Sequence, residues 1–160
     1  MNKIVILSPK QKALSINLDN NIYGTVVEAG AGQEVVRHFF RAGAASGTVA
    51  KAMSAYDKYF SNSIYGKEKN NRHVCSSRLN NMLYHEYKLI TNRLKNSEHK
   101  EKSFFTYANT ICTINYEKTN QGHGWMGVRF QTSSSSKHND VIIHVRLHDP
   151  ETSLQQETVG

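Results

Sequence analysis

Two groups of polar residues in this sequence have types and spacing that could support chemistry. The first surrounds residues 28–33 (EAGAGQ), where a β-rich segment ends in Glu28 and runs into a glycine-rich turn before a helix. Turns of this kind build S-adenosylmethionine and dinucleotide sites, because Gly30 and Gly32 let the backbone approach a ligand and a helix N-terminus favours negative charge. Gln33 stands where the third glycine of that pattern would be, so a purely structural strand-to-helix turn is the alternative.

Glu28, Gln33 and Arg37 form a possible ligand-binding set beside this turn. Gln33 and Arg37 are four residues apart, so they share one face of the predicted helix near the end of the strand that carries Glu28. A carboxylate, an amide and a guanidinium could together hold a polar ligand. The alternative is a structural ion pair between Glu28 and Arg37.

The second group lies on the strands predicted near the C-terminus. Period-two alternation puts His144, Arg146 and His148 on one face, opposite an apolar set that we expect to point inward (Val141, Ile143, Val145 and Leu147). The preceding strand turns four further residues to its polar face: His123, Trp125, Arg129 and Gln131.

These residue types favour proton transfer or anion binding over metal binding. Histidine titrates near neutrality, and arginine binds carboxylate or phosphate through paired contacts. His144 and His148 are roughly 13 Å apart on an extended strand, so they do not share a zinc ion, and we expect no metal site. The candidate catalytic residues are therefore Glu28, His123 and His144, and a solvent-facing polar sheet is the alternative.

Composition limits the class of protein. A length of 160 residues fits one domain over residues 1–160, and two cysteines are too few for a disulfide framework. No stretch has the apolar length of a secretory signal or of a membrane span, which predicts a cytoplasmic protein with no membrane partner. The net charge of +7 could attract nucleic acid, but the lysines are scattered, so a solvated basic surface is the preferred interpretation.

The pattern along the chain predicts a mixed α/β or α+β fold. Residues 3–7 indicate a strand or arm, and residues 22–28 a strand. Three helices follow, the first ended by Gly43, the second capped by Ser46 with apolar residues from Val49 to Phe60, and the third over about 77–95. Three antiparallel strands are expected over 104–116, 125–131 and 141–148, and the tail after residue 151 shows no terminating element.

Three strings in the sequence are similar to those of a known family. They are residues 28–40 (EAGAGQEVVRHFF), 123–131 (HGWMGVRFQ) and 142–146 (IIHVR). They resemble the N-terminal part of longer bacterial proteins that are variously named nicotinate-nucleotide adenylyltransferase or TonB-dependent receptor. The resemblance implies that this chain corresponds to the first part of a longer architecture. Such adenylyltransferases carry an His-x-Gly-His turn, whereas this chain has Gly122-His123-Gly124-Trp125.

Three functions follow as expectations. The first is binding or transformation of an anionic, nucleotide-like small molecule, for which the sequence identifies no cofactor. Glu28, Gln33 and Arg37 would position that molecule, while Arg129, His144 and Arg146 would neutralise its charge, which requires both groups to line one cleft. The alternatives are a non-catalytic module that assembles with itself or with a further C-terminal region, and a nucleic-acid-binding domain.

Overall fold

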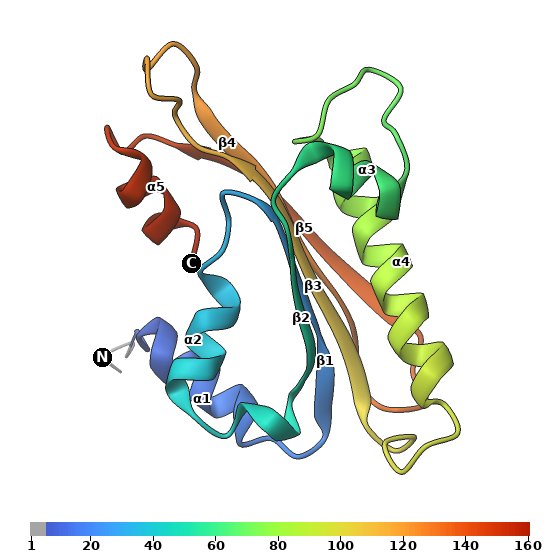
Figure 1. The fold of residues 1–160 in the computed structure, drawn as a ribbon. Helices are drawn as coiled ribbons and strands as arrows, with labels where there is room; N and C mark the ends of the chain where they lie inside the picture. The colour runs from blue at the N-terminus through green and yellow to red at the C-terminus, as the bar shows by residue number, and fades with distance from the viewer. Residues whose placement is uncertain (1–5) are drawn as a thin grey trace.

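The structure is a computed structural model that describes residues 6–160, in which five α-helices surround one five-stranded sheet (Figure 1). The helices are α1 (Pro9–Asn17), α2 (Val35–Ala42), α3 (Lys58–Tyr65), α4 (Ser76–Leu94) and α5 (Thr152–Thr158), with a short 3-10 helix, η1 (Ala45–Gly47). The strands are β1 (Ile22–Gly30), β2 (Val49–Ala55), β3 (Ser103–Cys112), β4 (Gly122–Gln131) and β5 (His138–Leu147).

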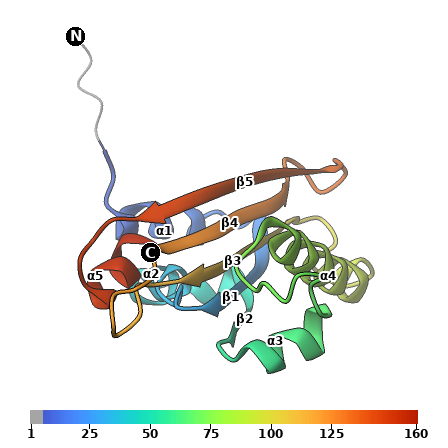
Figure 2. The same cartoon turned by 90° about the horizontal axis from the view of Figure 1, so that it is seen from above.

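The sheet is mixed, with the strand order β2-β1-β3-β4-β5. β1 pairs in parallel with both β2 and β3, whereas β3, β4 and β5 form an antiparallel meander. Seen from above, β5 lies at the outer side of this meander (Figure 2). The predicted fold class is confirmed, as is the antiparallel arrangement of the last three strands.

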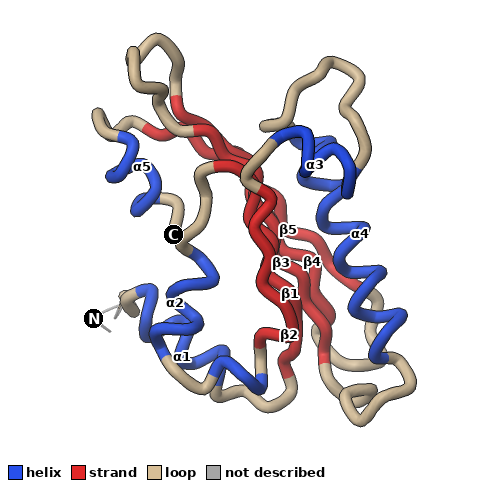
Figure 3. Tube along the Cα trace, viewed as in Figure 1, coloured by secondary structure: helices blue, strands red, loops and turns tan. Residues whose placement is uncertain are grey.

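Helices cover both faces of the sheet (Figure 3). On one side, which we call the α4 face, Leu79, Met82 and Leu83 of α4 are fully buried against Val27 and Ala108 of the sheet. On the other side, the α2 face, α1, α2 and α5 are placed along the strands (Figure 1). A second core there contains four buried residues: Ala31, Ile111, Leu147 and Val159.

One predicted helix is wrong. Residues 49–55 form strand β2, and a separate helix, α3, begins at Lys58 after the cap residue Asp57. The Asp57 carboxylate accepts hydrogen bonds from the backbone N–H groups of Tyr59 and Phe60, which fixes the helix start there. Parallel pairing of β2 with β1 outweighs the helical spacing of the apolar residues in this segment.

The ends of the chain also differ from expectation. At the N-terminal end, Ser8 caps α1 and forms a capping box with Gln11. At the C-terminal end, the tail forms α5, in which Gln155 is buried. The predicted strand or arm at residues 3–7 lies mostly outside the described residues. Among residues 6–160, no helix has the length and apolarity needed to cross a membrane.

Candidate functional site

Glu28 is buried and occupied by contacts within the protein. Its carboxylate accepts hydrogen bonds from the backbone N–H groups of Val35 (3.1 Å) and Val36 (3.4 Å) and from the Asn109 amide (3.1 Å). Burial raises the pKa of this carboxyl, and the two backbone hydrogen bonds and the Asn109 hydrogen bond oppose the rise. Glu28 therefore supplies the hydrogen-bond acceptor for two free N–H groups at the N-terminal end of α2.

The glycine-rich turn packs against β3. Gly30 has a φ of 70°, and a side chain there would collide with the Ile111 carbonyl oxygen. A side chain at Gly32 would meet the Asn109 amide, and the Ala31 N–H donates to the Ile111 carbonyl at 3.0 Å. Both glycines therefore allow a close approach of two protein segments.

Gln33 and Arg37 do not join Glu28 in a shared cluster. The Gln33 amide donates to the Gly30 carbonyl at 2.8 Å, across the turn. The Arg37 guanidinium is exposed and lies 3.5 Å from the Glu34 carboxylate, so the Glu28–Arg37 ion pair is not formed.

The second group is brought together by the register of β4 and β5. His123 lies opposite Arg146, and Trp125 lies opposite His144. The Trp125 and His144 rings are stacked with centroids 4.6 Å apart, and His144 Nε2 lies 3.4 Å from His123 Nδ1. The strand alternation predicted from the sequence therefore holds for these four side chains.

Arg129 and Gln131 belong to other contacts on the same strands. The Arg129 guanidinium donates two hydrogen bonds to the Asp140 carboxylate, at 2.8 and 2.7 Å. This pairing lowers the pKa of Asp140 and raises that of Arg129. The Gln131 side chain accepts from the Phe104 N–H and donates to two carbonyls of the 132–137 loop.

The two polar groups lie on opposite faces of the sheet. Val27 belongs to the core beneath α4, so its neighbour Glu28 points to the α2 face, where it meets the start of α2. Trp125 and Ile142 pack against the core beneath α4, and His144 shares the face of Ile142. The requirement that both groups line one cleft is not met.

A pocket of about 480 Å³ lies over the second group, on the α4 face. Its wall combines the β4–β5 residues with the segment that leads into α4. The lining residues are Arg72, Val74, Cys75, Ser76, Gln121, His123, Trp125, His144 and Arg146. We call this space the Arg72–Arg146 pocket, and no aspartate or glutamate lines it.

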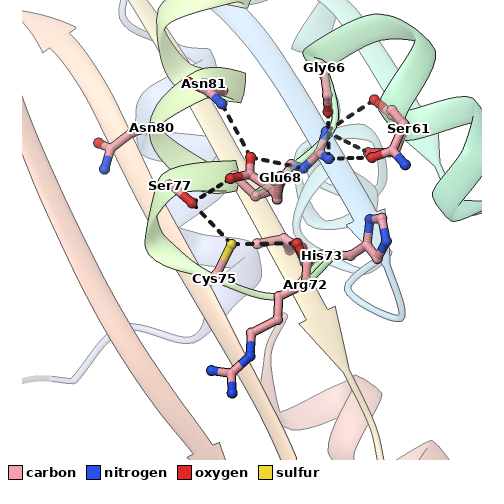
Figure 4. A network of polar contacts seen from close by, with 12 residues as sticks. Ser61, Gly66, Glu68, Arg72, His73, Cys75, Ser77, Asn80 and Asn81 are labelled. Atoms are coloured by element: carbon pink, nitrogen blue, oxygen red, sulfur yellow. Dashed lines mark hydrogen bonds and ion pairs between the residues drawn. The ribbon is translucent and has the colours of Figure 1, made fainter. Parts of the chain in front are cut away.

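Arg72 is the residue of this pocket that the sequence did not indicate, because the polar run 67–72 has the composition of an ordinary loop. Earlier residues of the same loop are tied to α4 by Arg78, which is fully buried. The Arg78 guanidinium donates to the Ser61 carbonyl at 3.1 Å and to the Gly66 carbonyl at 2.8 Å. Figure 4 shows this polar network, with the Arg72 side chain pointing away from the side where Glu68 and Ser77 lie.

The Arg72–Arg146 pocket is electropositive. Among residues 6–160, no ion pair or side-chain hydrogen bond engages the guanidinium of Arg72 or of Arg146. Burial lowers the pKa of His123, and the neighbouring His144, Arg146 and Arg72 lower it further by electrostatic repulsion of a second positive charge. The N-terminal end of α4 adds to this field, because its cap residue Cys75 makes no side-chain capping hydrogen bond.

The pocket has the donor set of an anion site. Among residues 6–160 there is no group of three or more histidine, cysteine, aspartate or glutamate side chains that could hold a metal ion. Guanidinium groups, imidazoles and free helix N–H groups all donate to oxygen anions. The Trp125 ring adds an aromatic surface in the same pocket.

Comparisons with known proteins show a shared fold. No protein-family model matches the chain, and no curated protein matches its sequence. The competence/damage-inducible protein CihA from Agrobacterium tumefaciens matches with a TM-score of 0.63 at 14% identity, covering 98% of this chain and 93% of that one. A CinA superfamily protein from Klebsiella pneumoniae matches with a TM-score of 0.65 at 8% identity, covering 96% and 91%.

A CinA superfamily protein from Escherichia coli gives a similar result, with a TM-score of 0.60 at 11% identity over 99% of this chain and 90% of that one. This chain thus has the fold of solved CinA-type proteins over almost its whole length. No comparison supports the adenylyltransferase or receptor name.

Proposed function

We propose that this protein binds an anionic, nucleotide-like small molecule in the Arg72–Arg146 pocket. The observation that carries the proposal is the meeting of two arginines and two histidines in one pocket with no carboxylate among its lining residues. Two cationic guanidinium groups in one pocket with no carboxylate partner repel each other, and an anion between them would relieve that repulsion.

The chemical class follows from the lining. Phosphate oxygens accept hydrogen bonds from guanidinium groups and from the free N–H groups at the start of α4. The half-buried Trp125 ring offers an apolar surface to a base or a sugar. A volume of about 480 Å³ is in the range of small-ligand sites.

The test is titration calorimetry of the purified chain with adenosine monophosphate, ribose 5-phosphate and neutral adenosine. Both phosphates are expected to bind and adenosine is not, because the charge supplies most of the interaction. Arg72→Ala and Arg146→Ala should each weaken binding about tenfold, the value of one charge-assisted hydrogen bond at an exposed position.

Arg37→Ala is the matched control, because Arg37 is an exposed arginine on the opposite face of the sheet. Its affinity should equal that of the unchanged protein. Loss of binding in Arg37→Ala with retention in Arg146→Ala would move the site to the glycine-rich turn and overturn the proposal, as would equal binding of adenosine and adenosine monophosphate.

A further inference from the structure

The outer edge of β5 is a long and regular strand edge. β5 spans ten residues and pairs with β4 through an unbroken register from Gln131–His138 to Gly122–Leu147. Among residues 6–160, no backbone hydrogen bond joins β5 to any segment other than β4. Its other row of N–H and C=O groups therefore faces outward.

Three features that often prevent edge-to-edge pairing are missing from this strand. Protective devices include proline, lysine and β-bulges within an edge strand. Residues 138–147 contain neither proline nor lysine, and the register with β4 has no shift. The opposite edge, β2, is only seven residues long and carries Lys51.

β5 also exposes an apolar stripe on the α2 face. Val141 and Ile143 are 51% and 49% exposed, although the sequence pattern predicted that they point into a core. They lie beside Val128 and Met126 of β4 in the register. The stripe is therefore the outer margin of an apolar sheet surface that stops at the strand edge.

The charges of β5 favour one particular partner, which is β5 itself. On the face opposite the stripe, the acid Asp140 lies in the first half of the strand and the base Arg146 in the second half. A parallel copy would place like charges side by side. An antiparallel copy places each acid near a base.

One antiparallel register satisfies both faces at once. With Ile143 opposite its own copy, Asp140 lies opposite Arg146 of the partner subunit, and Val141 lies opposite the partner subunit's Val145. A shift of two residues in one direction sets Asp140 against a histidine, His144 of the partner subunit. A shift in the other direction sets Ile142 against the partner's Arg146, so both alternatives lose the charge pairs.

We propose that β5 is a dimer interface, in which two copies of this chain join their sheets through antiparallel β5–β5 pairing centred on Ile143. The interface is isologous, since a two-fold axis through Ile143 relates the two strands. It joins two five-stranded sheets into one continuous sheet. Opposed side chains on such a pair are close enough to contact one another.

The proposal does not depend on the anion pocket. Ile143 and Val141 lie on the α2 face and do not line that pocket, so substitutions there leave its residues unchanged. Arg146 lines the pocket and, in the dimer, also lies opposite the partner's Asp140, whose carboxylate it would share with Arg129. The two experiments below read out mass and cross-linking at residues outside the pocket, so failure of ligand binding would not refute the dimer.

The first experiment measures the mass of the full chain by light scattering at physiological ionic strength across micromolar concentrations. The expected mass is twice the 18.1 kDa of one chain. Ile143→Lys should give a monomer with unchanged circular dichroism, because it places two like charges on the two-fold axis. Phe60→Lys, at a comparably exposed apolar residue of α3, should remain dimeric.

The second experiment tests the register by oxidation. In a background with Cys75 and Cys112 replaced by serine, Ile143→Cys puts the two introduced thiols directly opposite, within the distance that a disulfide spans. Val141→Cys puts them four residues apart along the strands, roughly 13 Å, which is too far. A cross-link in Ile143→Cys alone supports the proposal. A monomeric mass for the unchanged chain, or a stronger cross-link in Val141→Cys, overturns it.

Discussion

Replacement of Arg78 by methionine tests how the loop beside the Arg72–Arg146 pocket is held in place. Arg78 is fully buried, and its guanidinium ties helix α3 and the loop after it to helix α4. It donates to Asn62 Oδ1 at 2.5 Å, and its Nε lies 3.6 Å from the Glu68 carboxylate. Methionine fills a similar length but donates nothing.

The cost has two parts. Loss of one partner from a buried ion pair costs about 3–5 kcal/mol. The lower end applies to Glu68, because its carboxylate keeps hydrogen bonds from Ser77 and Asn81. The carbonyls of Ser61 and Gly66 lose their donor, which adds about 1–2 kcal/mol after relaxation. We expect Arg78→Met to lower the free energy of unfolding by about 4 kcal/mol and the Tm by about 10 °C.

The assay is urea unfolding followed by circular dichroism, with thermal unfolding as a second measure. Arg93→Met is the control, since Arg93 is an exposed arginine of the same helix and its loss should change stability by less than about 0.5 kcal/mol. The double variant Arg78→Met with Glu68→Gln should recover part of the loss, because it removes the unpaired buried charge. A free energy of unfolding for Arg78→Met within about 1 kcal/mol of the unchanged protein would refute this account of the network.

Three further measurements test the electrostatics of the fold. The affinity for sulfate, whose charge is constant in this range, should rise as the pH falls from about 8 to about 6. A bound anion raises the lowered pKa of His123, so binding takes up a proton, and a flat calorimetric profile would contradict this. Burial is the main cause that lowers the pKa of His73, and both of its ring nitrogens lack a partner among the described residues. Below about pH 6.5 the unfolded chain therefore binds more protons at His73 than the folded chain does, and the free energy of unfolding should fall as the pH drops. Urea unfolding of His73→Leu at pH 7 and 5 should show a smaller drop than the unchanged protein, and an equal drop would exclude His73 as the cause. Glu28→Ala should lower the free energy of unfolding by about 3 kcal/mol, because the Val35 and Val36 N–H groups lose their acceptor. Glu28→Gln should lower it less, because one side-chain oxygen remains. Equal losses of unfolding free energy in urea would show that these hydrogen bonds contribute little.

Much of the fold follows from local pattern. The apolar spacing of α4 and the alternation of the last three strands predicted their type and approximate position, because each of these elements buries one regular face. The segment 46–60 could not be assigned in the same way. Its apolar residues fit helical spacing, and only the parallel register with β1 makes residues 49–55 a strand.

The candidate site was predictable in part. Alternation alone put His144 and Arg146 on one face, and the strand register then brings His123 and Trp125 beside them. Arg72 could not be found in this way, because it lies in a loop with no regular period, and only the folded chain brings that loop beside β4 and β5. The glycine-rich turn is a different case. The sequence left a ligand site and a structural turn open as alternatives, and the structure shows that its glycines make room for β3, a segment about 80 residues later in the chain.

The parallel pairing of β1 on both sides has a consequence for synthesis of the chain. Ile22 of β1 pairs with Ser103 of β3, 81 residues later. The other neighbour, β2, is the next strand in sequence and reaches β1 through a crossover that contains α2. At about 5–20 residues per second, a ribosome delivers β3 roughly 4–16 s after β1. During that interval the backbone N–H and C=O groups on one edge of β1 lack their final partner, so that edge is open to pairing with another segment.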